Sequence, residues 1–297
     1  MAGLSGDALA LLEALRRESQ DSLATTGNVC ARSGVLAWSD GSLAIHTDFG
    51  PEGQDKDTNQ DFALAWTSGN EEDALRWAVA LADGVTSSWH AEHAAELACW
   101  KGLESLIQSS PSEVRARDAF SAAGNAIGRV GDSIEADAEA YLPEGEFAST
   151  WRFTLREGLL LQTTLSFTWM ENGTIHLAFV GDGGATVELC EGNQKSLEIV
   201  GDIDDCTNRV HALGPRNRQV SESDVYRAFD EQRVRRIGMY TDGVGRGLNT
   251  SSRSFLEELD DAESLHQNVA ARLIAGWVNS APNQFEDNLS LAVVTRK

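Results

Sequence analysis

The sequence has few basic residues. It carries 24 lysines and arginines against 46 aspartates and glutamates, which gives a formal net charge of −22 over 297 residues. A surface this acidic repels phosphate backbones and anionic lipid headgroups, so the composition argues against nucleic-acid binding and against membrane binding. Cations and basic peptide segments are better partners. The charge is equally compatible with a role in solubility alone.

Cysteine is also scarce, and the four residues are widely separated with no C-x-x-C pair (Cys30, Cys99, Cys190 and Cys206). This spacing favours buried thiols in a reducing compartment over a disulfide framework or a zinc site. No apolar run reaches the length of about 18 residues that a membrane span requires, and the first residues lack the pattern of a signal peptide. We therefore expect a cytoplasmic protein.

Hydrophobic residues make up 41% of the chain, enough for a sizeable core. Their periodicity, together with turn signals, predicts an N-terminal helix, strands, a helical pair, more strands, a helix and a closing strand. The predicted strands are 35–38, 43–46, 62–67, 75–82, 160–170, 174–181, 185–190, 234–241 and 289–295, and the predicted helices are 7–22, 90–108, 113–139 and 262–279. Residues 191–233 are rich in turn formers, which predicts a long surface excursion.

This order of elements lacks the βαβ rhythm of a parallel sheet. It fits an α+β fold in which two mainly antiparallel sheets pack together and are covered by helices. The chain contains no internal repeat and no low-complexity linker. We therefore predict one main domain over residues 31–297, preceded by a helical extension over residues 1–30.

Three aspartates share one sequence context. Asp83, Asp182 and Asp242 each follow an apolar strand and precede a glycine, and Asp287 lies just before the last strand. A strand end is a rigid mount, and the glycine lets backbone carbonyls approach a ligand. Hard cations such as Mg²⁺ and Mn²⁺ prefer oxygen ligands of this kind. Asp-Gly is a common turn, but its repetition at three strand ends favours a metal site.

Electrostatics supports the same interpretation if these strand ends converge. Two carboxylates about 4 Å apart repel each other by roughly 4 kcal/mol at an effective dielectric constant of 20. Three or four carboxylates in one cluster would cost more than a typical domain tolerates. Either some are protonated or a cation lies among them. Since no run of lysine or arginine lies nearby, a cation is the simpler explanation.

The motifs, taken in order, resemble those of the protein phosphatase 2C-like family, and its bacterial branch is the better match. They are Thr47–Gly50, Lys56–Asp61, Ala82–Gly84, Thr163–Thr164, Val180–Asp182, Ala212–Gly214, Tyr240–Gly243 and Asp287–Asn288, so the resemblance covers about residues 43–296. Members of this family are metal-dependent Ser/Thr protein phosphatases. The resemblance implies a four-layer α/β/β/α sandwich, in agreement with the predicted order of elements.

The resemblance also implies a role for each motif residue. Asp83 would bridge two Mn²⁺ or Mg²⁺ ions, and the Gly84 carbonyl would bind the second ion. Asp242 and Asp287 would hold the first ion, and Asp61 would bind or orient the waters of the second.

Two further roles follow from the same resemblance. Asp182 matches the aspartate that holds a weaker third ion, and Lys56 matches an arginine that binds the substrate phosphate. Lysine keeps the positive charge but lacks the bidentate fork.

Other positions also depart from the family pattern. Gln60 replaces a glutamate, residues 85–88 replace a glycine-rich run, and Gln162 replaces a glycine. Arg246 occupies a position where the family often has an aspartate for the third ion, so that ion is expected to bind weakly or not at all.

Three other signals are set aside. Residues 55–61 imitate the start of an EF-hand loop, but Gln60 occupies the obligatory glycine position. His90 and His93 lie three residues apart on a predicted helix without the H-E-x-x-H pattern, which favours a solvated helix face over a zinc site. Residues 202–205 resemble the D-x-D of aspartyl-phosphate enzymes, but no apolar parallel strand precedes them, so a loop over the site is expected.

The resulting hypothesis is a monomeric, bacterial-type enzyme that hydrolyses phosphoserine and phosphothreonine in proteins, with a cognate Ser/Thr kinase as a further partner. Two alternatives stay open. Lys56, Gln60 and Arg246 also fit a catalytically weak or inactive phosphatase-like protein that binds a phosphoprotein or a regulator. The motifs also fit a phosphatase that acts on a small-molecule ester.

Overall fold

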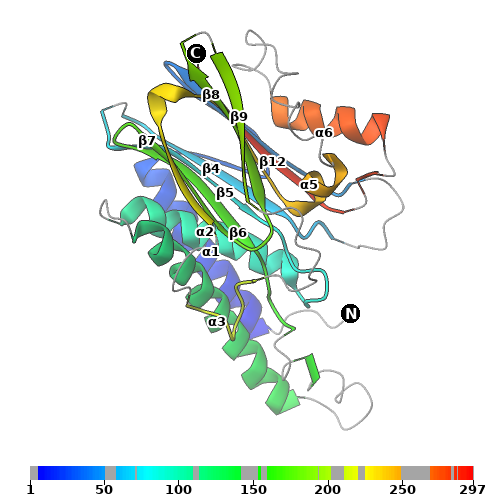
Figure 1. Cartoon of the computed structure of the whole chain (residues 1–297). Coiled ribbons are helices and arrows are strands. Elements are labelled where there is room, and N and C mark those ends of the chain that lie inside the picture. The colour runs from blue at the N-terminus through cyan, green and yellow to red at the C-terminus, as the bar shows by residue number, and fades with distance from the viewer. Residues whose placement is uncertain are drawn as a thin grey trace.

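The computed structural model describes residues 6–50, 58–70, 72–109, 114–141, 153–154, 159–192, 194–201, 211–219, 225–248, 268–281, 284–285 and 287–296. Two six-stranded sheets pack face to face between two layers of helices, so the predicted four-layer α/β/β/α sandwich is confirmed (Figure 1). None of the described helices combines the length and the apolar composition that a transmembrane segment requires.

Every pair of neighbouring strands in both sheets is antiparallel. The first sheet has the order β1 (Gly27–Ala31), β4 (Phe62–Ser68), β5 (Leu75–Ala82), β6 (Leu165–Glu171), β7 (Thr174–Val180) and β10 (Val225–Asp230). The second has the order β2 (Ser33–Trp38), β3 (Gly41–Asp48), β12 (Leu289–Arg296), β11 (Val234–Tyr240), β8 (Gly184–Glu191) and β9 (Gln194–Val200).

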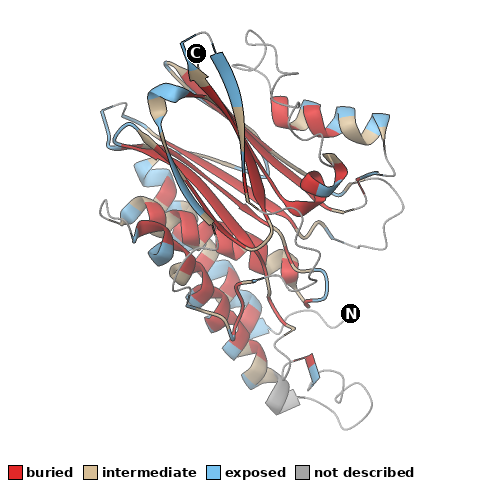
Figure 2. Cartoon of the chain, viewed as in Figure 1, coloured by how far each residue is buried: buried red, intermediate tan, exposed pale blue. Residues whose placement is uncertain are grey.

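Helices cover the outer face of each sheet. Helices α1 (Gly6–Thr26), α2 (Ala91–Gln108) and α3 (Arg115–Tyr141) lie over the first sheet, and α5 (Asp242–Leu248) and α6 (Val269–Ser280) lie over the second (Figure 1). Burial follows these layers, because the central strands are buried on both faces, whereas α1 and α6 are buried along one face (Figure 2). Burial on both faces explains why β5 is a nearly continuous apolar run. Helix α2 lies between the first sheet and the helices α1 and α3 and is buried on most sides.

Strand β5 shows how one sequence serves two cores. Its alternate residues Ala78 and Ala80 pack with the helices, whereas Trp77, Val79 and Leu81 pack between the two sheets. This alternation follows from the two-residue period of a strand. The small alanines let α2 lie close to the sheet, while the large residues fill the space between the sheets.

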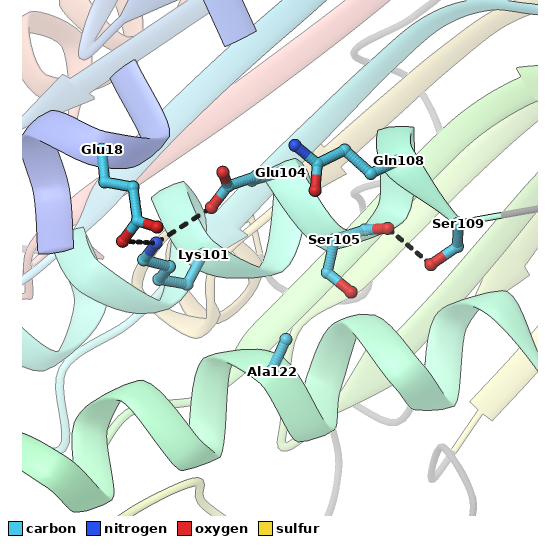
Figure 3. A pocket seen from close by; sticks show the side chains of 7 residues that line it. All are labelled: Glu18, Lys101, Glu104, Ser105, Gln108, Ser109 and Ala122. Atoms are coloured by element: carbon cyan, nitrogen blue, oxygen red, sulfur yellow. Dashed lines mark hydrogen bonds and ion pairs between the residues drawn. The ribbon is translucent and has the colours of Figure 1, made fainter. Parts of the chain in front are cut away.

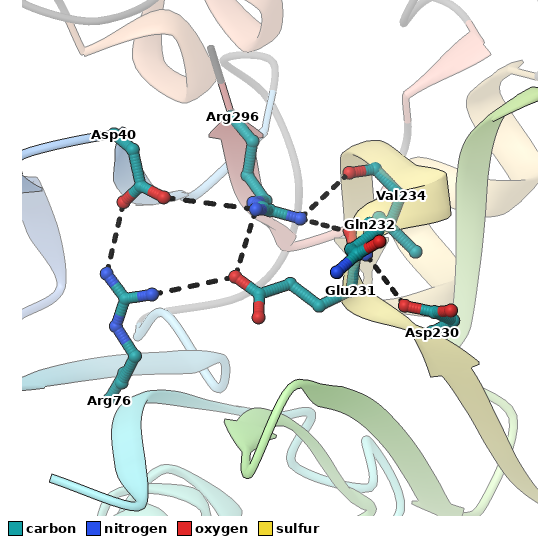
Figure 4. A network of polar contacts seen from close by, with 7 residues as sticks. All are labelled: Asp40, Arg76, Asp230, Glu231, Gln232, Val234 and Arg296. Carbon is teal, nitrogen blue, oxygen red and sulfur yellow. Dashed lines mark hydrogen bonds and ion pairs between the residues drawn. The ribbon is translucent and has the colours of Figure 1, made fainter. Parts of the chain in front are cut away.

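A charged network joins the two sheets (Figure 4). Its residues come from β5 of the first sheet, from the β2–β3 turn and β12 of the second, and from the 3₁₀ helix Glu231–Arg233 between β10 and β11. Arg76 contacts Asp40 at 3.1 Å and Glu231 at 3.6 Å, and Arg296 contacts Glu231 at 2.9 Å and Asp40 at 3.9 Å. Each carboxylate therefore lies between two guanidinium groups. Networks of this kind contribute more than isolated surface pairs.

Most predicted elements are confirmed, including the hairpin at Asn172–Gly173, where both residues have positive φ as a two-residue turn requires. The predicted strand at 160–170 begins too early, because β6 starts at Leu165 and Leu161 has a φ of 51°. The prediction of a long surface excursion over 191–233 is wrong for two segments of it, because Gln194–Val200 and Val225–Asp230 form the strands β9 and β10. The helix α5 and the strand β1 were not predicted.

Helix α3 carries glycines on the face that contacts residues 211–219. Gly124 and Gly128 lie against Arg218, and Gly131 lies against Pro215. Arg218 also pairs with Asp132 on the same helix through both guanidinium nitrogens. The missing side chains let this segment pack directly on the helix, and the segment in turn pairs with Thr163 beside the end of β5.

Gly124→Ala is expected to destabilise the protein by about 1–3 kcal/mol, because the new Cβ would clash with the Arg218 backbone carbonyl. Gly276→Ala in α6 is the matched control, since nothing lies within 4 Å of the Cβ that it adds. There the helix propensity of alanine should stabilise by up to about 1 kcal/mol. Urea unfolding measures both. Equal effects of the two substitutions would contradict the packing described here.

Candidate metal centre

Five aspartates lie at strand ends on one edge of the sandwich. Asp83 follows β5 directly, and Asp182 and Asp242 follow β7 and β11 after one residue each. Asp61 and Asp287 precede β4 and β12. Antiparallel pairing brings them to one edge, because the start of one strand lies beside the end of its neighbour. The end of β5 pairs with the start of β4, and the end of β11 pairs with the start of β12.

Three of these carboxylates meet directly. One oxygen each from Asp83, Asp182 and Asp242 lies within 4.8 Å of the other two. Asp61 and Asp287 also act electrostatically on Asp83, so all five belong to one cluster. The convergence expected from the sequence is therefore observed, and it includes Asp61 and Asp287, which no glycine follows.

Burial and mutual repulsion disfavour ionisation of this cluster. Burial raises the pKa of Asp61 to about 7, with further increases from the charges of Asp242 and Asp287. Burial, followed by the charge of Asp61, raises the pKa of Asp83 well above its usual range. Burial and the charge of Asp242 raise the pKa of Asp182 to about 6. Each shift has the sign expected for carboxylates that are buried beside like charges.

Two carboxylate oxygens in the cluster lack a hydrogen-bond partner within the described part of the chain. They are Asp61 Oδ1 and Asp242 Oδ1, and both are buried. A buried polar atom without a partner is costly. Mg²⁺ and Mn²⁺ prefer carboxylate oxygens, so this donor set fits a divalent ion.

Hydrogen bonds hold the other oxygen of Asp61 in place. Thr241 Oγ1 donates to Asp61 Oδ2 at 2.8 Å and accepts from the Ser290 amide at 3.1 Å. The hydroxyl thus connects β4, β11 and β12 at the site. Thr241 was not predicted as a site residue, and its position next to Asp242 is the only signal that the sequence offers.

The backbone at Asp83 is fixed by the threonine pair of the sequence motif. Thr163 Oγ1 donates to the Asp83 carbonyl at 2.8 Å, and the Thr164 amide donates to the same oxygen at 2.8 Å. The Asp83 amide donates to Thr164 Oγ1 at 3.2 Å. These bonds give both threonines of the motif a structural role, because each holds the backbone of Asp83.

Gly84 is required by close packing. A Cβ at this position would come within 2.8 Å of the Ala91 backbone at the start of α2 and of the Gln60 carbonyl. The Gly84 amide also donates to that carbonyl at 3.1 Å. Gln60 itself is anchored by Asn288, whose Oδ1 accepts from the Gln60 amide at 2.9 Å.

Lys56, the predicted phosphate-binding residue, lies outside the described residues, as does the 202–205 segment. The prediction for Lys56 therefore stays a prediction. Gln162 lies close to the site, where its carbonyl accepts from the Val85 amide at 3.1 Å.

The two histidines at the start of α2 are more enclosed than the expected solvated helix face. The His90 side chain is 14% exposed, and Glu92 Oε1 lies 3.8 Å from His90 Nδ1 and 3.9 Å from His93 Nε2. Ligand atoms of the three residues lie within 4.8 Å of one another. Glu92 is thus a shared partner of both imidazoles, which accounts for this cluster without an ion.

A pocket of about 360 Å³ lies between α1, α2 and α3 (Figure 3). Its polar wall centres on Lys101, which pairs with Glu18 at 2.9 Å and with Glu104 at 3.0 Å. None of the five aspartates lines it. Lys101 lies between the two carboxylates of this pocket and pairs with both, whereas the five aspartates form a separate group at the strand ends.

Comparison with known proteins gives one family and a set of related folds. The model of the family described as "Protein phosphatase 2C" matches residues 53–279. No curated protein sequence matches the chain.

Solved structures with a similar fold include the serine-threonine phosphatase 2C of Toxoplasma gondii, with a TM-score of 0.59, 13% identity and coverage of 91% of this chain and 100% of that one. The Mycobacterium tuberculosis serine/threonine phosphatase PstP/Ppp has a TM-score of 0.56, 19% identity and coverage of 87% and 100%. The corresponding values for Stp1 of Staphylococcus aureus are 0.55, 14%, 90% and 97%. At these identities the likeness establishes the fold.

Asp83→Asn should raise the unfolding temperature of the metal-free protein by at least about 2 °C, because it removes a buried carboxyl group whose ionisation the fold disfavours. Mn²⁺ should stabilise the wild type and have little effect on the variant. Thermal unfolding in EDTA and in Mn²⁺ tests both points. Asp40→Asn is the control, since Asp40 precedes a glycine but pairs with Arg76. A metal-free Asp83→Asn protein less stable than the wild type would contradict the proposed repulsion.

Proposed function

The chain belongs to the protein phosphatase 2C family of metal-dependent Ser/Thr phosphatases, and we propose that its five clustered aspartates are the catalytic metal centre. The observation that carries the proposal is the convergence of Asp83, Asp182 and Asp242 within 4.8 Å, beside the unpartnered oxygens of Asp61 and Asp242. These atoms form a set of hard oxygen donors with excess negative charge.

The residues divide into ligands and supports. Asp83 would bridge two ions, with Asp242 and Asp287 holding the first and the Gly84 carbonyl and Asp61 serving the second. When bound, two Mn²⁺ or Mg²⁺ ions supply Lewis-acid activation of water and of the phosphate ester.

The protein's own contribution is to hold the ligands before any ion arrives. Thr163 and Thr164 fix the backbone of Asp83, and Thr241 fixes one oxygen of Asp61. Lys56 would bind the substrate phosphate as a point charge.

The scale of the reaction supports a metal-based mechanism. Enzymes accelerate phosphate-monoester hydrolysis by up to about 10²¹-fold. A single general acid or base contributes about 10²–10⁴-fold. A centre that concentrates positive charge at the phosphate is therefore needed, and the carboxylate cluster is suited to hold it.

We further propose a phosphoprotein substrate, with a cognate Ser/Thr kinase as a partner. The net charge of −22 supports substrates with basic residues around the phosphorylated side chain. A cytoplasmic location is supported by the free thiols of Cys30, Cys99 and Cys190. We also propose residues 31–297 as the catalytic domain. Helix α1 precedes this range, but its Leu12 and Leu15 pack into the same hydrophobic core as α2.

Asp83→Asn and Asp242→Asn should each lower the Mn²⁺-dependent hydrolysis of p-nitrophenyl phosphate and of a phosphothreonine peptide by more than about 10³-fold. Each substitution replaces a negatively charged carboxylate of the proposed metal centre by a neutral amide of nearly the same size. Asp40→Asn should keep wild-type activity. Phosphate release measured for the three variants decides the matter, and full activity in both metal-centre variants would refute the assignment.

A further inference from the structure

Arg246 reaches into the carboxylate cluster from α5. It lies four residues after Asp242 on the same helix, so its side chain returns toward the helix start. Arg246 Nη2 lies 2.5 Å from Asp242 Oδ2 and 3.9 Å from Asp182 Oδ2, and Nη1 lies 3.9 Å from Asp287 Oδ2. One guanidinium therefore contacts carboxylates that follow β7, begin α5 and precede β12.

The guanidinium leaves the inner part of the cluster open. The Arg246 side chain is 62% exposed, so it approaches from the solvent side. Asp61 is buried, and its Oδ1 has no partner within the described residues. Asp242 divides its two oxygens, because Oδ2 contacts Arg246 whereas Oδ1 is buried and unpartnered. Arg246 and a divalent ion can thus share Asp242 without competing for the same oxygen.

The charges of the protein groups also match. Arginine keeps its positive charge at all ordinary pH values. Two divalent ions together with one guanidinium carry five positive charges, the same number as the negative charges of the five ionised aspartates. A third divalent ion next to Asp182 would exceed this balance and would meet the guanidinium.

We propose that Arg246 is a permanent cation of the centre, which neutralises Asp182 and one oxygen of Asp242 and so limits the site to two divalent ions. This inference rests on the proposed function, because it presupposes that the cluster binds metal. Arg246 is a positioning residue in this account, since it acts through the carboxylates. The expectation from the sequence, that a third ion binds weakly or not at all, lacked this direct contact.

The test is the number and affinity of Mn²⁺ ions bound, measured by isothermal titration calorimetry on Arg246→Asp, Arg246→Gln and the wild type. The wild type should bind two ions. Arg246→Asp should bind a third, and Arg246→Gln should bind Mn²⁺ about tenfold more tightly, because a nearby positive charge is removed. Arg246→Lys should retain wild-type stoichiometry.

Arg233→Ala is the matched control, since Arg233 is also an exposed arginine paired with a carboxylate, that of Glu191. It should leave Mn²⁺ binding unchanged. If Arg246→Asp does not fold, Arg246→Gln still decides the question. Unchanged stoichiometry and affinity in the Arg246 variants would overturn the inference alone, as would three ions in the wild type. A wild type that binds no Mn²⁺ would refute the proposed function as well.

Discussion

Electrostatic repulsion among buried carboxylates is the constraint around which this edge of the molecule is built. Antiparallel pairing brings Asp61, Asp83 and Asp242 to one edge of the sandwich, with Asp182 and Asp287 beside them. Burial and mutual charge oppose their ionisation, as the raised pKa values of Asp61, Asp83 and Asp182 show. A stable fold must therefore hold these groups rigidly and either protonate some of them or place cations among them.

The rest of the structure supplies that rigidity. The threonine pair fixes Asp83, and Thr241 links three strands at Asp61. Glycines on α3 seat the segment that pairs with Thr163. The network of Arg76 and Arg296 ties the two sheets together with matched charges. The two clusters of ionisable residues thus differ in charge balance. The network of Arg76 and Arg296 pairs opposite charges across the sheets. The five aspartates carry an excess of negative charge, which favours the binding of cations.

Much of this arrangement could be predicted from the sequence. The layers follow from strong apolar periodicity, and Asp-Gly at three strand ends identifies three of the five clustered aspartates, because both the strand and the turn are local signals. The strands β9 and β10 were missed because each is an edge strand with a mostly exposed, polar face. The helix α5 was missed because three of its seven residues are glycine, a poor helix former. The contact of Thr241 with Asp61 joins residues far apart in the chain, which no local pattern encodes. The pair of Asp242 and Arg246 has the spacing of a helical i,i+4 pair, but that spacing is informative only once α5 is known to be a helix.

The most direct measurement is anomalous diffraction from a crystal of the protein soaked in Mn²⁺. We expect two anomalous peaks that share Asp83 as a ligand, with Arg246 still in contact with Asp182. Absence of anomalous density at the five aspartates, with Mn²⁺ bound elsewhere or not at all, would contradict the central claim that this cluster is a metal centre.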